Sequence, residues 1–391
     1  MTRPPITVEE AQRLLAAEVP APVDEEAALA DAAARVLAED CSSDVDMPPF
    51  DRATMDGYAV AAADTPGELD VVDEIAAGRG DPRPIARGRC AKIMTGAPVP
   101  PGADAIQQLE KTTPNGARVR ILEGVKPGQN IAPRASELRR GEVILRRGQL
   151  LRPPEIAVLA TIGRARVRVH RGPRCAVFAT GSELVEPPAA PGPGQIRNSN
   201  AHSVAAQVRA LGLACDVLPV ARDSVDDLRA RIRDGMSRDV LVISGGVSAG
   251  DYDLVPPALE AEGVRCLVHQ VRLRPGRPFY FGRRDRKVVF ALPGNPVSSY
   301  VTFEVFVRPF LGRMMGGDFS RPMVRARLAD ALPKKHDRVQ YLPARLEAGA
   351  VRIVPWKGSG DIFALTRANA LAIQPIDCAL REGDVIDVML L

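Results

Sequence analysis

Residues 239–246 read DVLVISGG, a run of apolar, mostly β-branched residues that ends in two glycines. Such a run, bounded by a turn, is typical of a strand that is buried on both faces. Similar runs precede and follow it, RCAVFAT at 174–180 and KVVFALPG at 287–294. Amphipathic segments such as 224–236 stand between the runs. This alternation of strands and helices predicts a doubly wound α/β domain with a parallel sheet and right-handed crossovers over residues 172–316.

The sequence outside this segment has a different pattern of residues. From residue 47 to about residue 149, short strands are separated by Gly and Pro, which predicts a β-rich domain. Residues 321–391 return to the same pattern and predict a small β-barrel or sandwich. Helices are expected from apolar periodicity and from capping residues such as Thr7 with Glu10. Their predicted positions are 7–18, 24–40 and 153–163.

The composition limits the class of protein. The 391 residues are 46% hydrophobic and 26% charged, the balance of a folded globular chain and not of a disordered one. No apolar run approaches the ~20 residues that a membrane-spanning helix needs. The N-terminus lacks the apolar core of a secretory signal, so we expect a cytoplasmic protein with no membrane partner. The six cysteines and four histidines show no CxxC or HExxH spacing, which argues against zinc and against disulfides.

The net charge of +4 conceals a strong preference for arginine, with 45 Arg and 7 Lys. Residues 139–174 hold ten Arg and two acidic residues, a density that could attract nucleic acid. No aromatic residue is interleaved with these arginines, and the alternating pattern ARVRVHR places them on one solvated face. We therefore expect no nucleic-acid partner.

Polar residues follow each strand of the predicted sheet. In an open parallel sheet, ligands bind outside the carboxyl ends of the strands, so these residues should converge on one edge. The same acids could instead cap the helices that follow them. The residues after the strands are Ser182, Glu183, Asp223, Ser248, Asp251, Asn295 and Pro296.

Two of these turns suit an anion. The glycine-rich turn at 245–250 can bring backbone N–H groups to a ligand, and Asn295 with Pro296 begins a helix whose free N–H groups favour phosphate. Carboxylates beside an anion would repel it unless a divalent cation lies between them. The pattern therefore predicts a Mg²⁺-dependent site for a phosphate-bearing or oxyanionic substrate. Arg274 and Arg277, in RPGRP, would add positive charge.

The β-rich segment carries a second group of polar residues. Spacing alone does not separate a function for this group from ordinary turn chemistry. Its members are Asp51, Arg52, Asp56, Tyr58, Thr95, Arg134 and Glu137.

Nine segments, in chain order, resemble the molybdopterin molybdenumtransferase family, MoeA, which includes the E domain of gephyrin. The combination of MDGYAV, MTGAPVP, SGGVS and LPGNP is highly specific. The segments are PPFDRATMDGYAV (48–60), KIMTGAPVPPGADA (92–105), GQNI (128–131), FATGSELV (178–185), GQIRNSN (194–200), ISGGVSAGDYD (243–253), RPGRPF (274–279), LPGNPVSS (292–299) and GSGDIFALTRANAL (358–371).

The resemblance implies four parts. An N-terminal composite region would comprise residues 1–46 and 139–171, and a β-rich domain would be inserted at 47–138. A molybdopterin-binding α/β domain would follow at 172–316, and a C-terminal β-barrel domain at 321–391. The resemblance also implies a homodimer, in which the α/β domain of one subunit and the β-rich domain of the other form the active site. The resemblance also makes other proteins of molybdenum-cofactor biosynthesis candidate partners.

The reaction that the resemblance implies is the Mg²⁺-dependent insertion of molybdate into adenylylated molybdopterin. AMP is released and molybdenum cofactor is formed. Two other functions stay open, a non-catalytic pterin-binding scaffold and a molybdopterin adenylyltransferase. A complete set of acids disfavours the scaffold, and the N-terminal and C-terminal domains disfavour the adenylyltransferase. The sequence does not choose between molybdate and tungstate, which are tetrahedral dianions of similar size.

The resemblance also implies roles for single residues. Asp56, Glu183, Asp223 and Asp251 match the catalytic acids, with Asp56 supplied across the dimer. The last three would hold Mg²⁺. Arg134 matches a basic position near molybdate. The implied substrate-binding residues are Thr95, Arg134, Ser182, Gly245, Gly246, Ser248, Arg274, Arg277, Pro293, Gly294, Asn295 and Pro296.

Departures from the family pattern are few. The loop SAGDYD, which contains Asp251, is shorter than in some members. RPGRP replaces the KPGKP of many members. Gln270 stands where some members carry a base, and Ser136 stands where an acid often occurs.

Overall fold

The computed structural model describes residues 4–247 and 254–391. The chain folds into two compact units. Unit 1 comprises Met1–Ala38, Gly148–Arg152 and Arg168–Leu391, and unit 2 comprises Glu39–Arg147 and Pro153–Val167. No helix in the described part of the chain has the length and apolar character needed to cross a membrane.

A six-stranded sheet forms the centre of unit 1, in the order β16-β13-β17-β21-β20-β18. Strands β16, β13, β17 and β21 are parallel, as predicted. Strand β20 runs antiparallel to β21, because only residues 285–286 join the two and a parallel crossover needs a dozen or more. The bounds are β13 (Cys175–Ala179), β16 (Cys215–Val217), β17 (Val240–Ser244), β18 (Arg265–His269), β20 (Tyr280–Arg284) and β21 (Lys287–Leu292).

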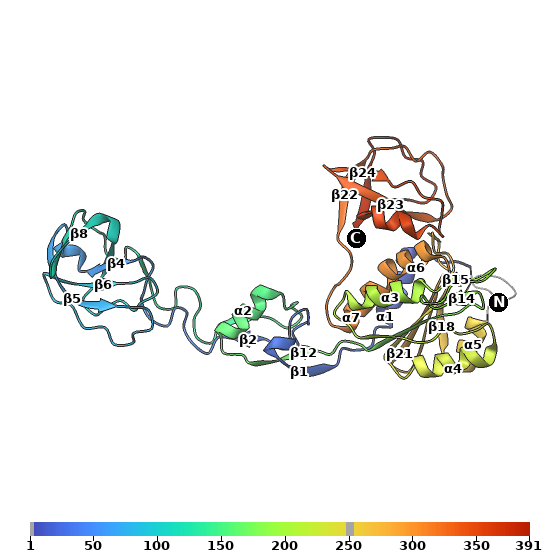
Figure 1. Ribbon diagram of the computed structural model, residues 1–391, viewed down its shortest axis with the longest axis horizontal. Helices are drawn as coiled ribbons and strands as arrows, with labels where there is room; N and C mark the ends of the chain where they lie inside the picture. The colour runs from blue at the N-terminus through green and yellow to red at the C-terminus, as the bar shows by residue number, and fades with distance from the viewer. Residues whose placement is uncertain (1–3, 248–253) are drawn as a thin grey trace. The chain divides into compact units, whose positions relative to one another are not determined.

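Helices cover both faces of this sheet, as the buried sequence runs predict. Every residue of β13 is buried, and alternate side chains belong to different cores. Val177 packs in the core with α3, α6 and α7, whereas Phe178 packs in the core with α4 and α5. Figure 1 shows these two groups of helices on opposite faces. The bounds are α3 (Asn200–Arg209), α4 (Val225–Gly235), α5 (Val255–Ala261), α6 (Pro296–Thr302) and α7 (Arg308–Met314).

The predicted long helix after residue 295 is present, with a π-helical turn at Phe303–Val307 between α6 and α7. Pro309 explains part of this irregularity, because it has no N–H to donate to the Val305 carbonyl. The side chain of Gln12 donates to that carbonyl instead, at 3.2 Å. Gln12 belongs to α1 (Val8–Ala17), which begins as predicted with Thr7 accepting the Glu10 N–H.

The prediction of a helix at 24–40 is wrong. Strand β1 (Asp24–Ala28) and a single 3₁₀ turn at Leu29–Asp31 occupy its first part. β1 pairs with β12 (Arg166–His170), and the N–H groups of Ala34 and Leu37 donate to carbonyls of residues 151 and 149. Long-range pairing therefore outweighs the helix propensity of this alanine-rich segment.

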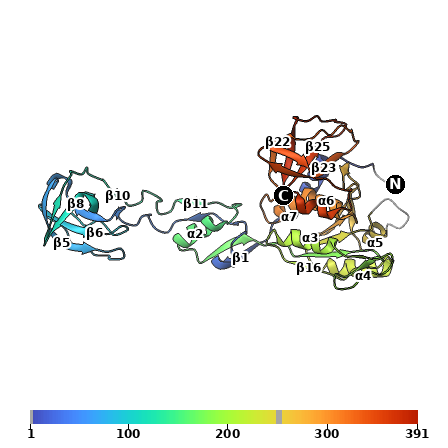
Figure 2. The same cartoon turned by 45° about the horizontal axis from the view of Figure 1, so that its top comes forward.

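The C-terminal segment is a closed five-stranded barrel, as predicted. Its strands follow the order β23-β24-β22-β26-β25, and a further pairing between β23 and β25 closes it. Strand β19 (Leu273–Arg274) pairs with β23 and joins the barrel to the α/β domain. Figure 2 shows the barrel strands β22, β23 and β25 next to helices α6 and α7 of that domain. The bounds are β22 (Met323–Leu328), β23 (Val339–Glu347), β24 (Ala350–Ile353), β25 (Ala370–Gln374) and β26 (Val385–Leu390), with a 3₁₀ helix at Ile362–Arg367.

Unit 2 contains the predicted β-rich domain, a six-stranded curled sheet in the order β7-β4-β6-β5-β9-β8. Helix α2 (Pro153–Thr161) lies in the same unit and ends before Gly163, whose positive φ of 74° stops the helix as expected. The sheet strands are β4 (Gly57–Val60), β5 (Gly67–Ile75), β6 (Arg89–Ile93), β7 (Ala105–Gln108), β8 (Thr112–Asn115) and β9 (Arg118–Ile121). Unit 2 also contains the short strands β2 (Cys41–Ser42), β3 (Arg52–Ala53), β10 (Ile131–Ala132) and β11 (Val143–Leu145). Two further short strands, β14 (Leu184–Val185) and β15 (Ile196–Arg197), belong to unit 1.

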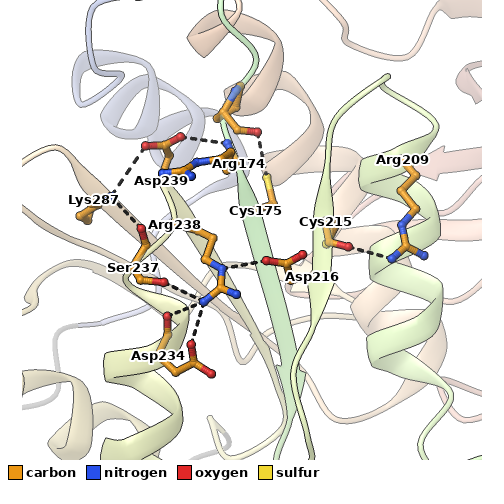
Figure 3. Close-up of polar contacts among 11 residues, drawn as sticks. Arg174, Cys175, Arg209, Cys215, Asp216, Asp234, Ser237, Arg238, Asp239 and Lys287 are labelled. Atoms are coloured by element: carbon orange, nitrogen blue, oxygen red, sulfur yellow. Dashed lines mark hydrogen bonds and ion pairs between the residues drawn. The ribbon is translucent and has the colours of Figure 1, made fainter.

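Charged residues fix the amino edge of the central sheet in unit 1 (Figure 3). The Asp239 carboxylate accepts the Arg174 N–H at 2.9 Å and lies 3.0 Å from Arg171 Nη1. Lys287 Nζ lies 3.7 Å from its other oxygen. Partial burial raises the pKa of Asp239. The Arg174 N–H, Arg171 and Lys287 together lower this pKa by more than burial raises it, so that it lies below the ordinary value of 3.8. The charged form of Asp239 therefore stabilises the edge.

We expect the contribution of Asp239 to stability to depend on pH. Because its folded-state pKa is lowered, the contribution is complete above pH 3.8 and is lost as the pH falls through the folded-state pKa. Asp239→Asn should lower the apparent Tm by about 2–4 °C at neutral pH. Calorimetry from neutral pH down to about pH 3 should show this difference shrinking. A difference that stays constant over that range would contradict a role for the charge.

Candidate active site

A cavity of about 760 Å³ lies at the carboxyl ends of the parallel strands in unit 1. Its size is that of a small-molecule site. The loops after β13, β16, β17 and β21 all contribute to its wall, as the sequence predicts. Eight predicted site residues line it, namely Glu183, Asp223, Gly245, Gly246, Pro293, Gly294, Asn295 and Pro296.

Asp223 joins two of the loops. One carboxylate oxygen accepts the Ser182 N–H at 2.9 Å, and the other accepts the Thr180 hydroxyl at 3.3 Å. The Asp223 N–H donates in return to the Ser182 hydroxyl oxygen at 3.4 Å. The structure therefore brings Ser182, Glu183 and Asp223 into one group. The Glu183 carboxylate folds against Gly181, where a Cβ atom would lie 2.5 Å from it.

Two glycine-rich turns meet at the floor of the cavity. Gly245 has a φ of 97°, and a Cβ atom there would lie 2.6 Å from the Thr180 carbonyl oxygen, so only glycine fits. Asn200 holds the two turns together, because its Nδ2 donates to Ser244 Oγ at 2.9 Å and to the Gly294 carbonyl at 2.7 Å. Sequence reasoning gave no role to Asn200. The sequence feature that could have indicated this role is the position of Asn200 in GQIRNSN, at the start of a helix that faces this edge.

Pro296 begins helix α6 and Asn295 occupies the N-cap position, as predicted. The side chain of Asn295 makes no capping bond, however, and its Nδ2 donates to Ser359 Oγ at 2.9 Å. The Val297 N–H also donates to the Ser359 carbonyl at 3.0 Å. The C-terminal barrel thus contacts this helix end, and Gly360 lines the cavity. The contribution of the barrel was not expected from the sequence.

The two arginines of RPGRP have different surroundings in the structure. Neither Arg274 nor Arg277 is among the residues that line the cavity in the described chain, although Pro278 is. The Arg274 guanidinium lies 2.8 Å from Nδ1 of His336 in the barrel. Partial burial and then Arg274 hold the pKa of His336 below 6.5, so that Nδ1 can accept the bond. Arg277 is exposed.

Ser248 and Asp251 lie outside the described residues. Within residues 4–247 and 254–391, no group of three or more His, Cys, Asp or Glu side chains is placed to hold a metal ion. Two of the three predicted Mg²⁺ ligands, Glu183 and Asp223, line the same cavity. Their carboxylates, with the hydroxyls of Thr180 and Ser182 nearby, are the hard oxygen donors that Mg²⁺ prefers. The residues present therefore fit this ion.

Unit 2 brings together two further predicted residues. The Asp56 carboxylate accepts both the N–H and the hydroxyl of Thr95, each at 2.7 Å. These bonds hold the pKa of Asp56 below 3.8, the N–H bond having the larger effect. Arg134 lies elsewhere in the unit, where its Nε donates to Asp46 at 2.8 Å and its N–H donates to Asp51 at 2.8 Å.

Comparison with known proteins covers almost the whole chain. Residues 6–163 match the MoeA N-terminal region (domain I and II), and residues 176–313 match a probable molybdopterin binding domain. Residues 325–391 match the MoeA C-terminal region (domain IV). The chain belongs to the MoeA family. The resemblance seen in the sequence motifs is thereby confirmed.

Relatives of this MoeA-family chain include the molybdopterin molybdenumtransferase of Staphylococcus epidermidis. It is 32% identical over 369 residues, which cover 91% of this chain and 88% of the relative. The enzyme of the same name from Staphylococcus aureus has the same identity and coverage. A crystal structure of the molybdopterin biosynthesis MoeA protein from Pyrococcus horikoshii aligns with a TM-score of 0.85 and 32% identity, over 99% of this chain and 100% of that one. The multidomain fold is thus that of the family.

Proposed function

We propose that the chain is a molybdopterin molybdenumtransferase, which inserts molybdate into adenylylated molybdopterin, releases AMP and forms molybdenum cofactor. The observation that supports this most is the cavity at the carboxyl edge, which combines Glu183 and Asp223 with two glycine-rich turns. Apart from Gly360, its lining residues belong to the segment that matches a probable molybdopterin binding domain. Its volume of about 760 Å³ suits a pterin with an attached nucleotide better than it suits molybdate alone.

The residues around the cavity suggest how the reaction proceeds. Backbone N–H groups of the turns at 245–247 and 294–298 are suited to hold phosphate oxygens as AMP leaves, apart from those of Gly245 and Val297, which donate to Leu292 and Ser359. Glu183 and Asp223, with Asp251, would hold Mg²⁺, and the bound ion would supply positive charge to neutralise a pyrophosphate group. Asp223 fixes the relative positions of the loops after β13 and β16 through its bonds to Thr180 and Ser182.

The proposed reaction is tested by measuring AMP release. Purified full-length protein is mixed with adenylylated molybdopterin and Mg²⁺, with and without molybdate. We expect AMP release to depend on molybdate and the molybdenum-containing product to appear in equal amount. AMP release that is the same without molybdate, or tight binding of the pterin with no release at all, would contradict the proposal. Repeating the AMP-release assay with tungstate in place of molybdate measures which of the two oxyanions the protein prefers.

We further propose that the protein acts as a homodimer, in which Asp56 and Thr95 of one subunit complete the cavity of the other. The support is the resemblance of MDGYAV to the family segment whose acid is supplied across the dimer, together with Thr95, which holds Asp56 in its charged form. A second charged carboxylate of this kind would be suited to orient the bound Mg²⁺ ion, which in turn attracts the anionic substrate.

Two inactive variants are expected to restore activity when they are mixed. A dimer that contains one Asp56→Asn subunit and one Asp223→Asn subunit retains one intact site of two. With random exchange of subunits, an equal mixture should recover about a quarter of the wild-type rate of AMP release. The separate variants and mixed wild-type protein are the controls. A mixture that is no more active than its separate components would show that both residues act from the same subunit.

A further inference from the structure

We propose that Arg197 binds a phosphate group of the substrate. This inference rests on the proposed function and adds a residue to which the sequence analysis gave no role. Arg197 ends strand β15, which pairs in parallel with β14, so that Arg197 lies beside Val185. Among the described residues that line the cavity, it is the only lysine or arginine.

The side chain of Arg197 is held by neutral groups. Its Nε donates to the carbonyl oxygens of Pro187 and Ala189, at 3.0 and 3.2 Å. Carbonyl oxygens orient a guanidinium but do not neutralise its charge. In the described chain no carboxylate pairs with Arg197, and its Nη1 and Nη2 groups donate no hydrogen bond. The guanidinium is therefore anchored at one nitrogen, and two donor groups are left for a ligand.

The cavity contains negative charges that a positively charged residue would balance. Glu183 and Asp223 contribute negative charge, and a phosphate-bearing substrate adds more. Arg274 lies against His336 and is not among the described residues that line the cavity. A guanidinium with two free donor groups matches the spacing of two phosphate oxygens, which lysine does not.

A purely structural role for Arg197 is the competing interpretation. In that case Arg197 only fixes the loop at residues 187–195 through its two carbonyl contacts, and its charge is incidental. The two interpretations differ in one measurable quantity, the preference of the cavity for a ligand that carries phosphate over the same ligand without it. A residue that only fixes the loop affects both ligands alike.

The test measures binding of AMP and of adenosine to the full-length protein by isothermal titration calorimetry at low salt. We expect wild-type protein to bind AMP more tightly than adenosine by about tenfold to a hundredfold. Arg197→Ala should lose most of this preference while its affinity for adenosine stays unchanged. Arg197→Lys should regain part of it, because the charge returns without the planar fork.

Arg209→Ala is the matched control. Arg209 also donates to a carbonyl oxygen, that of Cys215 at 2.7 Å, but at the amino edge of the sheet (Figure 3). It should keep the full preference for AMP. A preference that survives in Arg197→Ala, or is absent from wild-type protein, would overturn the inference. Molybdate-dependent AMP release by the wild type, measured in parallel, tests the proposed function separately, so that failure of either one is recognised.

Discussion

Replacing Asp223 by asparagine is expected to lower molybdate-dependent AMP release about a hundredfold while the protein stays folded. Asparagine keeps the shape and one acceptor oxygen, so the bond from the Ser182 N–H can persist. The variant loses the negative charge, which the proposed function requires for Mg²⁺. The expected loss of activity therefore measures the effect of the Asp223 charge apart from the effect of the hydrogen bonds that Asp223 accepts from Thr180 and Ser182.

The control for this variant is Asp227→Asn. Asp227 lies four residues further along, accepts the Arg222 N–H at 2.8 Å, and is not among the residues that line the cavity in the described chain. Its replacement should leave AMP release unchanged. The rate is measured at saturating molybdate, and the apparent Mg²⁺ requirement is measured for both variants. If Asp223→Asn releases AMP as fast as Asp227→Asn, the charge of Asp223 has no part in the reaction.

The largest loss of stability is expected on replacing Glu304. This carboxylate is only 1% exposed and lies 2.7 Å from the Nε atoms of both Arg308 and Arg321. Gln207 donates to it at 2.7 Å as well. Glu304→Ala would leave two guanidinium groups without their partner in a buried environment. Removing one member of such a group costs about 3–5 kcal/mol in the free energy of unfolding.

Urea unfolding followed by tryptophan fluorescence measures this loss. The chain has one tryptophan, Trp356, which packs against the cores of both the α/β domain and the barrel. Glu347→Ala is the control, because Glu347 pairs with Arg345 on the surface and should contribute less than about 1 kcal/mol. Equal unfolding midpoints for the two variants would show that the buried group around Glu304 does not stabilise the fold.

The sequence predicts the parts of the site that local rules determine. Buried apolar runs define the strands, and the residues that follow them must reach the carboxyl edge, which places Glu183 and Asp223 together. Pro296 likewise predicts the start of α6, because proline is favoured at the first helical position. These predictions need no knowledge of distant contacts.

The incorrect or missing predictions all depend on residues that are distant in the sequence. Residues 24–28 form a strand because they pair with β12. The Asn295 side chain contacts Ser359 and does not cap its own helix. Asn200 acquires its role only when the turns after β17 and β21 lie side by side. No local pattern in the sequence specifies these contacts.

Amide hydrogen exchange tests whether the cavity at the carboxyl edge holds adenylylated molybdopterin. The full-length protein is measured with and without this substrate, in the absence of molybdate so that no turnover occurs. We predict slower exchange at residues 180–184, 244–247 and 293–298, and unchanged exchange at the amino edge around Cys175 and Asp239. Slower exchange confined to the amino edge, or no change at the three predicted segments, would contradict the claim.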